Sequence, residues 1–303
     1  MQKQVSIEPK QFAAYVSAAQ EAGAEVVPLS SAVRALIWTD YARPDLLDRV
    51  LDENPQLLWV QLPFAGVDAF QESLQRQITF TSAKAAYREP VAEHALALAL
   101  SLARIIPERV RATSWGRKFA VSLFDANVVI VGGGGITETL IELLAPFRAN
   151  ITVLRNRPSE MAGAKQTLLI DSLDEVLPLA DFVFVATALT DLTRGMFDLR
   201  RFSLMKPSAY FINVARGAIV DTDDLVAALN EELIAGAGVD VTYPEPLPDG
   251  HPLWSAKNII ITPHTADTNE MVTRLFAVRV GINVKAFFDG GQLIGLVDPD
   301  LGY

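Results

Sequence analysis

The sequence has no cysteine, which excludes disulfide bonds, thiolate nucleophiles and cysteine-ligated metals. It has only three histidines among 303 residues, so little is available for a zinc site and we expect no metal. Basic residues are also scarce, because 26 Lys and Arg stand against 36 Asp and Glu, giving a net charge of −10. Proteins that bind nucleic acid usually present a basic face, so we expect no nucleic-acid partner.

The chain also lacks a long uninterrupted apolar run. The most apolar stretch, 91–106, contains Glu93, His94 and Arg104, and it is too short and too charged to span a bilayer. The opening residues, MQKQVSIEPK, have neither the cationic start nor the apolar run of a secretion signal. We therefore expect a cytoplasmic protein with no membrane partner.

The length corresponds to about two domains of roughly 150 residues, and half of the residues are hydrophobic, which is enough for globular cores. Short β-rich runs alternate with helical patterns, for example at 137–147 and from Asp221 onward. Six nearly continuous apolar runs in the second half are typical of strands buried on both faces: 128–131, 151–154, 182–186, 209–214, 238–241 and 259–262. This alternation predicts an open, doubly wound, parallel α/β sheet.

The first part of the chain repeats this organisation on a smaller scale. Its expected strands are 35–38, 57–62 and 78–81, and its expected helical segments are 45–52 and the region around 70–75. A long apolar helix at 90–106 would join the two parts, and a helix at 270–288 would return to the first part. We therefore expect a discontinuous domain of residues 1–96 and 270–303, and a second domain of residues 97–269.

A glycine loop, GGGGIT at 132–137, follows the expected strand 128–131 and precedes a helix. In the dinucleotide fingerprint G-x-G-x-x-G, Gly132 makes the tight turn and Gly134 lets the backbone approach a pyrophosphate at the helix N-terminus. Thr137 replaces the third glycine, so we expect a slightly displaced helix or another small neighbour. A flexible strand–helix turn is the alternative interpretation of such a loop. The cofactor-binding candidates here are Gly132, Gly134, Gly135 and Ile136.

The residues that follow the expected strand 151–154 indicate the type of dinucleotide. The fingerprint expects an acidic residue about 20 positions after the glycines, where it holds the ribose 2′-OH. The sequence has Arg155, Asn156 and Arg157 there instead. Two cations and an amide match a 2′-phosphate, which an arginine binds through two hydrogen bonds. The pattern therefore favours NADP(H) over NAD(H), although arginines at a strand end can also simply be solvated.

Three chemically active side chains follow the later strands. Arg216, Glu245 and His264 come after the expected strands 209–214, 238–241 and 259–262, at the edge where open α/β sheets bind ligands. Arg216 would bind a substrate carboxylate and polarise the adjacent carbonyl. His264 would give a proton to the carbonyl oxygen as hydride reaches the carbon, and Glu245 would raise the pKa of His264 through a hydrogen bond. Each of these residues alone is also typical of a surface or a turn.

With these motifs the sequence resembles the D-isomer-specific 2-hydroxyacid dehydrogenases over nearly its whole length. The matching segments are AGVD at 65–68, EPVAEHALALALSLAR at 89–104, the glycine loop, INVARGAIVD at 212–221, GVDVTYPEPLPDGHPLW at 238–254, ITPHTA at 261–266 and VDPDLGY at 297–303. The resemblance implies two Rossmann-like doubly wound domains, a flavodoxin-like substrate domain and a dinucleotide-binding domain, with the active site in the cleft between them. It also implies a homodimer whose cofactor domains pack together.

The resemblance assigns roles to individual residues. The catalytic arginine is Arg216, its acidic partner is Glu245, and the acid/base is His264. The remaining implied contacts are Asp240 to the nicotinamide carboxamide, Val214 and Ala215 to the nicotinamide pocket, Thr187 at the cofactor-facing end of its strand, and the backbone of Ala65, Gly66 and Val67, with Arg216, to the substrate carboxylate. We expect His94 to pack or cap within its apolar helix and His251 to be structural.

These observations lead to a functional hypothesis with one alternative. The leading interpretation is an oxidoreductase that reversibly reduces a small 2-oxo acid, such as glyoxylate, hydroxypyruvate or pyruvate, to the D-2-hydroxy acid with NAD(P)H. The alternative is a dinucleotide-sensing regulatory or corepressor-like binding protein on the same scaffold. The unusual loop favours the alternative, because Gly133 and Gly135 stand where the family commonly has leucine and arginine. The intact set of Arg216, Glu245 and His264 favours the enzyme.

Overall fold

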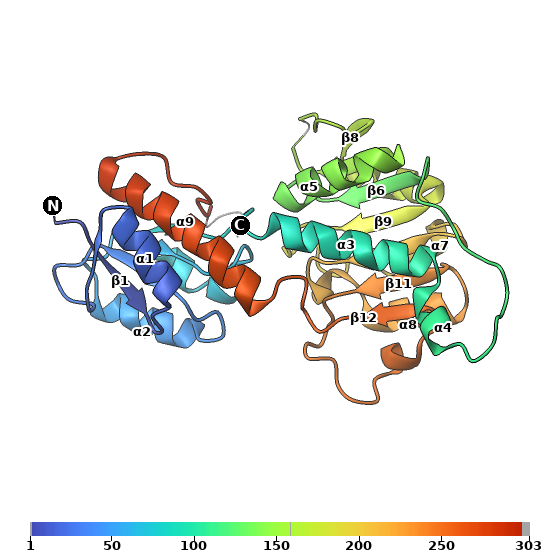
Figure 1. Ribbon diagram of the computed structural model, residues 1–303, viewed down its shortest axis with the longest axis horizontal. Coiled ribbons are helices and arrows are strands. Elements are labelled where there is room, and N and C mark those ends of the chain that lie inside the picture. Colours follow the sequence, from blue (N-terminus) through green and yellow to red (C-terminus); the bar gives the residue numbers. More distant parts are fainter. Residues whose placement is uncertain (1, 158, 299–303) are drawn as a thin grey trace. The chain divides into compact units, whose positions relative to one another are not determined.

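The computed structural model describes residues 2–157 and 159–298, and the chain divides into two compact units (Figure 1). The first unit consists of the residues up to Tyr87 and those from Thr268 onward, and the second unit is Arg88–Asp267. Both contain a sheet in which each pairing between named strands is parallel. The expected α/β class is confirmed.

The first unit has a five-stranded sheet in the order β2-β1-β3-β4-β5, which is the flavodoxin-like order. The strands are β1 Gln4–Glu8, β2 Glu25–Val26, β3 Ala35–Trp38, β4 Trp59–Gln61 and β5 Thr79–Thr81. The helices are α1 Ala13–Glu21, α2 Pro44–Glu53 and α9 Asn269–Asp289, with two short 3-10 turns at Asp68–Phe70 and Ser73–Gln75. Figure 1 shows α9, in red, beside α1, in blue, and the two helices are in contact.

The second unit has a seven-stranded sheet in the order β12-β11-β10-β9-β6-β7-β8. Counted from β6, this is the Rossmann order 3-2-1-4-5-6 with β12 added at the edge. The strands are β6 Asn127–Val131, β7 Asn150–Arg155, β8 Gln166–Leu169, β9 Phe182–Val185, β10 Tyr210–Asn213, β11 Gly236–Val239 and β12 Ile259–Ile261. The helices are α3 Arg88–Ala103, α4 Ile106–Arg111, α5 Gly135–Leu144, α6 Leu173–Val176, α7 Leu199–Leu204 and α8 Thr222–Asn230.

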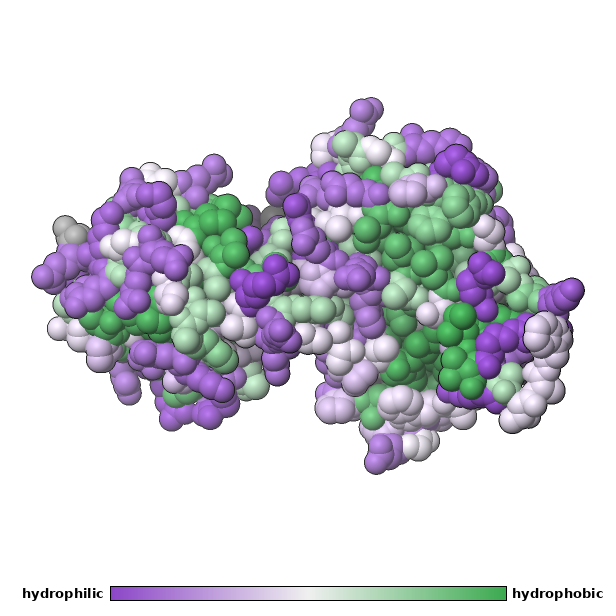
Figure 2. All heavy atoms as spheres, in the orientation of Figure 1, coloured by the Kyte–Doolittle hydropathy of each residue, from purple (hydrophilic) through white to green (hydrophobic). Residues whose placement is uncertain are grey.

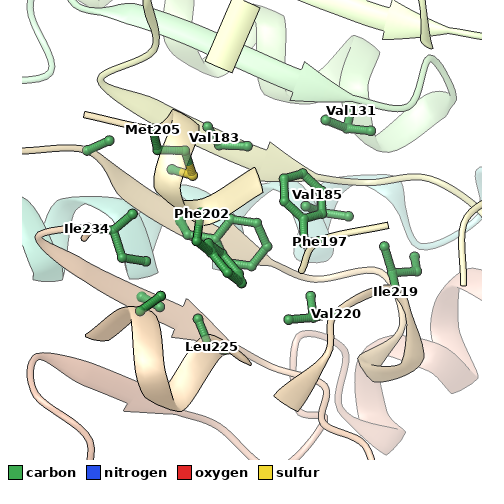
Figure 3. Close-up of a cluster of buried hydrophobic side chains, with 14 of the residues drawn as sticks. Val131, Val183, Val185, Phe197, Phe202, Met205, Ile219, Val220, Leu225 and Ile234 are labelled. Carbon is green, nitrogen blue, oxygen red and sulfur yellow. The ribbon is translucent and has the colours of Figure 1, made fainter. Parts of the chain in front are cut away.

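A large apolar cluster lies against one face of this sheet. Figure 3 shows Val183 and Val185 of β9 among Phe197, Phe202 and other buried side chains from the segments that follow. Both phenylalanine rings contact the ring of Phe211 in β10, with centroid separations of 4.8 and 5.3 Å. Burying aromatic and branched side chains of this size is the main stabilising contribution to such a core. The packed sheet is therefore a firm base for the loops at its carboxyl edge.

The boundary between the two units lies before the first helix of the second unit, nine residues earlier than expected. α3 runs without a break from Arg88 to Ala103 and packs against α5, β10 and β11. A boundary between residues 96 and 97 would cut this helix, whereas the two units separate between Tyr87 and Arg88. The reason is that the buried face of α3 is continuous along the helix. None of the helices in the described ranges has the length and apolar content needed to cross a bilayer.

Candidate active site

The candidate residues of the second unit gather at one edge of its sheet. The strand order reverses between β6 and β9, and open α/β sheets bind ligands at such a reversal, beyond the carboxyl ends of the strands. The glycine loop follows β6, and Thr187, half-buried, follows β9. The segments that contain Arg216, Glu245 and His264 follow β10, β11 and β12. Parallel pairing thus places all of these segments at the same edge.

The glycine loop has the geometry of a phosphate-binding turn. Gly132 has φ +114°, and a Cβ there would overlap the main chain of Ala186, so only glycine fits. Gly134 caps the ten-residue helix α5, and no described atom lies within 4 Å of the position that its Cβ would take. The first N–H groups of a helix carry partial positive charge and lack helical partners. The loop therefore fits the pyrophosphate of a dinucleotide.

Thr137 occupies the third glycine position of the fingerprint without leaving a polar group unpaired. Its side chain is fully buried, and its Oγ1 donates a hydrogen bond of 2.9 Å to the carbonyl oxygen of Gly132. We expected a displaced helix or a small neighbour to accommodate this residue. The structure shows a side-chain bond that ties α5 to the glycine turn, and α5 packs on α3.

Arg155, at the end of β7, lies across the glycine loop. A Cβ on Gly133 would come within 2.8 Å of Nε and 2.9 Å of Cδ of Arg155, so the glycine provides the space for this side chain. Arg155 is half-buried, and its Nη1 donates a long bond of 3.4 Å to the carbonyl of Ser159. Asn156 and Arg157 are exposed. A guanidinium thus lies beside the turn expected to hold the phosphates.

The segment after β10 is fixed by Asn213, a buried side chain. Its Oδ1 accepts a hydrogen bond from the N–H of Ala215, and its Nδ2 donates to the carbonyl of Arg216, both at 3.0 Å. Val214 and Ala215 are buried and Arg216 is half-buried. The next residue, Gly217, lies so close to the main chain of Thr242 that a Cβ would overlap it. The segment of Arg216 therefore rests on the one that leads to Glu245.

His264 and Glu245 form a hydrogen bond with 2.6 Å between Nδ1 and Oε1. Both side chains remain accessible, at 45% and 41% exposure. Because Nδ1 is bound to the carboxylate, Nε2 is the ring nitrogen left for a substrate. The segment of Glu245 is held by Thr222, whose Oγ1 donates a 2.5 Å bond to the carbonyl of Tyr243.

The charges around this pair favour the imidazolium. The hydrogen bond that His264 donates to Glu245 raises the pKa of His264 above 6.5, while burial and the positive charge of Arg216 act in the opposite direction. The same hydrogen bond lowers the pKa of Glu245 below 4.5. At neutral pH the pair thus combines a carboxylate with a histidine that holds a proton more strongly than usual.

Asp240, which follows β11, is buried and fully engaged with its own chain. Oδ1 accepts hydrogen bonds from Thr262 Oγ1 at 2.6 Å and from the N–H of Thr265 at 2.9 Å, and Oδ2 accepts from the N–H of Ala266 at 3.0 Å. Burial alone would raise the pKa of Asp240, but hydrogen bonds from His94, Thr262 and these N–H groups outweigh burial and hold the pKa at about 2. Its assignment to the nicotinamide carboxamide stays a prediction.

The other two histidines differ in their contacts. His94 in α3 lies with Nε2 2.9 Å from Thr262 Oγ1 and 3.4 Å from Asp240 Oδ1. The sequence predicted that His94 packs or caps within its helix, and it could not show that the hydrogen-bond partner of His94 lies on a distant loop. His251 caps a short 3-10 turn, with Nδ1 accepting a 3.1 Å bond from the N–H of Leu253, as its predicted structural role requires.

The predicted substrate-binding backbone belongs to the other unit. Ala65, Gly66 and Val67 follow β4 of the first unit; Ala65 is exposed and Val67 is buried. Their role stays a prediction. Within residues 2–157 and 159–298, no three histidine, aspartate or glutamate side chains gather into a set that could ligate a metal.

The family model described as "D-isomer specific 2-hydroxyacid dehydrogenase, NAD binding domain" matches residues 95–266. Two relatives of known function show similar coverage. The glyoxylate reductase/hydroxypyruvate reductase of Homo sapiens is 33% identical over 256 residues, covering 80% of this chain and 77% of the human protein. The glyoxylate reductase of Pyrococcus furiosus is 32% identical over 259 residues, with coverages of 80% and 77%.

A solved structure is similar over nearly the entire chain. It is a D-isomer specific 2-hydroxyacid dehydrogenase from Xanthobacter autotrophicus Py2 in complex with NADPH and MES. Its TM-score is 0.86 at 26% sequence identity, and the alignment covers 99% of each chain. The similarity therefore includes both units, whereas the family model covers most of the second unit alone.

Proposed function

The chain belongs to the D-isomer-specific 2-hydroxyacid dehydrogenase family, an NAD(P)-dependent family of oxidoreductases, and from this membership we propose that it reduces a small 2-oxo acid to the D-2-hydroxy acid with NADPH. Glyoxylate and hydroxypyruvate are the first candidate substrates, because relatives at 32–33% identity carry those names. The observation that carries the proposal is the 2.6 Å bond between His264 and Glu245 in a segment next to that of Arg216. A binding protein without catalysis would not need this set.

In the proposed reaction a hydride adds to the carbonyl carbon and a proton adds to the carbonyl oxygen. The nicotinamide supplies the hydride when the cofactor is bound. Arg216 pairs with the substrate carboxylate and polarises the neighbouring carbonyl. His264 donates the proton from Nε2, and Glu245 stabilises the imidazolium before the transfer. In the reverse direction the neutral imidazole accepts the proton of the hydroxyl.

The test of this activity is a panel of 2-oxo acids, including glyoxylate, hydroxypyruvate and pyruvate. Each is assayed with NADPH and with NADH by the absorbance of the reduced nicotinamide, and the product configuration is determined by chiral chromatography. We expect reduction of at least one acid to the D-hydroxy acid. Binding of the dinucleotide without reduction of any acid in the panel would favour the sensor instead.

We further propose that NADPH is preferred over NADH, because Arg155 lies beside the glycine loop where NAD-specific members carry an acidic residue. A guanidinium pairs well with a 2′-phosphate. Arg155→Asp should lower the ratio of NADPH to NADH efficiency, measured as kcat/KM for each cofactor. Arg148→Asp is the control, because it makes the same charge change at an exposed position between α5 and β7. An unchanged ratio in Arg155→Asp would contradict the proposal.

We also propose that the protein is a homodimer held by the second unit. Several large apolar side chains in α4 and in the segment between α4 and β6 are exposed, among them Val110 of α4, Phe124 and Trp115, which is 89% exposed. Figure 2 shows hydrophobic residues reaching the surface of this unit, on the face where Figure 1 places α3 and α4. Exposed apolar patches of this kind mark protein interfaces. Light scattering coupled to size exclusion should give twice the chain mass, and Trp115→Asp should weaken the dimer.

A further inference from the structure

One side-chain network in the second unit has no part in the mechanism above. It begins at His94 on α3, continues through Thr262 after β12 and ends at Asp240 after β11. We propose that His94 is a positioning residue for the catalytic acid: through Thr262 it fixes the carboxylate of Asp240, and that carboxylate holds the loop that contains His264. The inference rests on the proposed reductase function, since it concerns the same acid.

The donors and acceptors in this network can be assigned in only one way. A threonine hydroxyl has a single proton, and Thr262 gives it to Asp240 Oδ1 over 2.6 Å. The contact of 2.9 Å between His94 Nε2 and Thr262 Oγ1 must then be an N–H donor bond from the histidine. His94 therefore carries a proton on Nε2. His94 Nε2 also lies 3.4 Å from Asp240 Oδ1, so the ring is close to the carboxylate as well as bonded to the hydroxyl.

Asp240 links this network to the main chain around His264 through hydrogen bonds. Its carboxylate accepts the N–H groups of Thr265 and Ala266, and its carbonyl oxygen accepts the N–H of His264 at 2.8 Å. Three consecutive main-chain N–H groups are thus held by one residue. The loop benefits from such support, because His264 has φ +52°, a left-handed conformation that is uncommon for residues other than glycine.

Burial makes the network costly to disrupt. The side chain of Asp240 is 1% exposed and that of His94 is 22% exposed. A buried carboxylate is tolerated only while donors satisfy it, so the loss of one donor changes the position or the partners of the others. His94 belongs to α3, which packs on β10 and β11. The helix therefore gives His94 a fixed position, from which it supports a loop, and loops are usually more mobile than helices.

The first experiment measures the tautomer directly and does not depend on activity. The full chain has only three histidines, so nitrogen-15 NMR of histidine-labelled protein gives three ring systems. We expect His94 to be protonated on Nε2, and we expect Thr262→Val to change the ring signals of both His94 and His264. A His94 ring with no proton on Nε2 would overturn the inference, as would unchanged His264 signals in Thr262→Val.

The second experiment compares variants that keep or lose the donor. His94→Gln retains an N–H near the position of Nε2, whereas His94→Leu has none. His94→Leu should lower kcat about ten-fold, which corresponds to about 1.4 kcal/mol of activation free energy, while KM for the oxo acid stays near its wild-type value. His94→Gln should recover most of kcat. Wild-type kcat in His94→Leu, or equal losses in both variants, would overturn the proposal.

Two matched variants of Thr262, at the centre of the network, separate an effect on the position of the loop from an effect on folding. Thr262→Ser keeps the hydroxyl and Thr262→Val removes it at nearly constant volume. We expect Thr262→Ser to behave as wild type, and the loss in the double variant His94→Leu/Thr262→Val to be smaller than the sum of the single losses, because both act through Asp240. Additive losses would contradict the network. If the wild-type protein reduces no 2-oxo acid, the proposed function fails, and the NMR arm still decides the role of His94.

Discussion

At the scale of single residues, the left-handed backbone conformation of His264 decides which substitutions can test the role of its side chain. Asparagine tolerates the left-handed conformation better than alanine does, so His264→Asn separates the loss of the imidazole from strain in the loop. We expect His264→Asn and His264→Ala both to lower kcat by roughly 10²- to 10⁴-fold, the usual contribution of a general acid. Steady-state kinetics with the best 2-oxo acid measure this. Retained activity in both variants would remove His264 from the mechanism.

The pH dependence of reduction reports on the partner of His264. Glu245 raises the pKa of His264, and the protonated form is the proton donor, so activity falls as pH rises through that raised pKa. In Glu245→Gln the fall should occur at lower pH, because burial and Arg216 still lower the pKa and only the weaker influence of Asp240 still raises it. The measurement is kcat/KM for reduction across pH. Glu232→Gln, which breaks an exposed pair with Lys257, should leave the profile unchanged.

The two residues of this pair give contributions to stability with opposite dependences on pH. A raised pKa means that His264 contributes stability below pH 6.5, and that this contribution is lost as pH rises through the raised value. A lowered pKa means that Glu245 contributes above pH 4.5, and that this contribution is lost as pH falls. The pair is therefore most stabilising between these limits.

A substitution at Gly133 can test cofactor selection without changing residue 155 itself. A leucine there would put its Cβ within 2.8 Å of Nε of Arg155, so the guanidinium would have to leave the loop. Gly133→Leu should reduce the preference for NADPH, measured by the thermal protection that each dinucleotide gives. On an Arg155→Asp background the same substitution should change the preference little. An equal effect on both backgrounds would show that Gly133 acts independently of Arg155.

At the scale of elements, Thr137 joins α5 to the turn that precedes it. Thr137→Val keeps the shape of the side chain but leaves the carbonyl of Gly132 without its 2.9 Å partner. Losing a partner of a buried acceptor costs about 1–3 kcal/mol, so the free energy of unfolding should fall by that amount in urea denaturation. Thr139→Val, on the less buried side of the same helix, should have a smaller effect. Equal effects would contradict the importance of this bond.

The elements also show which parts of the fold could be predicted. Apolar runs located β3 exactly as observed and β6, β7 and β9 to within one residue at each end, because strands buried on both faces are continuously apolar. β1, β2 and β8 were not predicted: β2 and β8 are sheet edges, and β1 alternates polar with apolar residues, so it has no continuous apolar run. β11 begins two residues before its predicted start, because Gly236 lies against Asn258 and glycine has low strand propensity.

The site could be predicted only in part, for a similar reason. Arg216, Glu245 and His264 each follow a recognisable strand, so parallel topology alone brings their segments to one edge. The partner of His94 lies 168 residues away in the sequence, and no periodic pattern links the two positions. A histidine within an apolar helix was the available signal, and it did not identify Thr262 or Asp240.

At the scale of the whole molecule, the family assignment is confirmed by the match over residues 95–266 and by relatives that cover most of the chain. Each unit has its own sheet and core. We therefore expect differential scanning calorimetry to show two transitions, of which NADPH raises the one that belongs to Arg88–Asp267. A cofactor shift confined to the other transition would contradict the location of the dinucleotide site.

The pairing of α1 with α9 has a consequence for synthesis on the ribosome. The two helices contact each other, yet the whole of the second unit is translated between them. The amino-terminal strands therefore emerge long before the helix that covers them, and they must wait while a complete nucleotide-binding unit forms downstream. Nascent chains arrested before residue 269 should accordingly be protease-sensitive in the first 87 residues and resistant across the inserted segment.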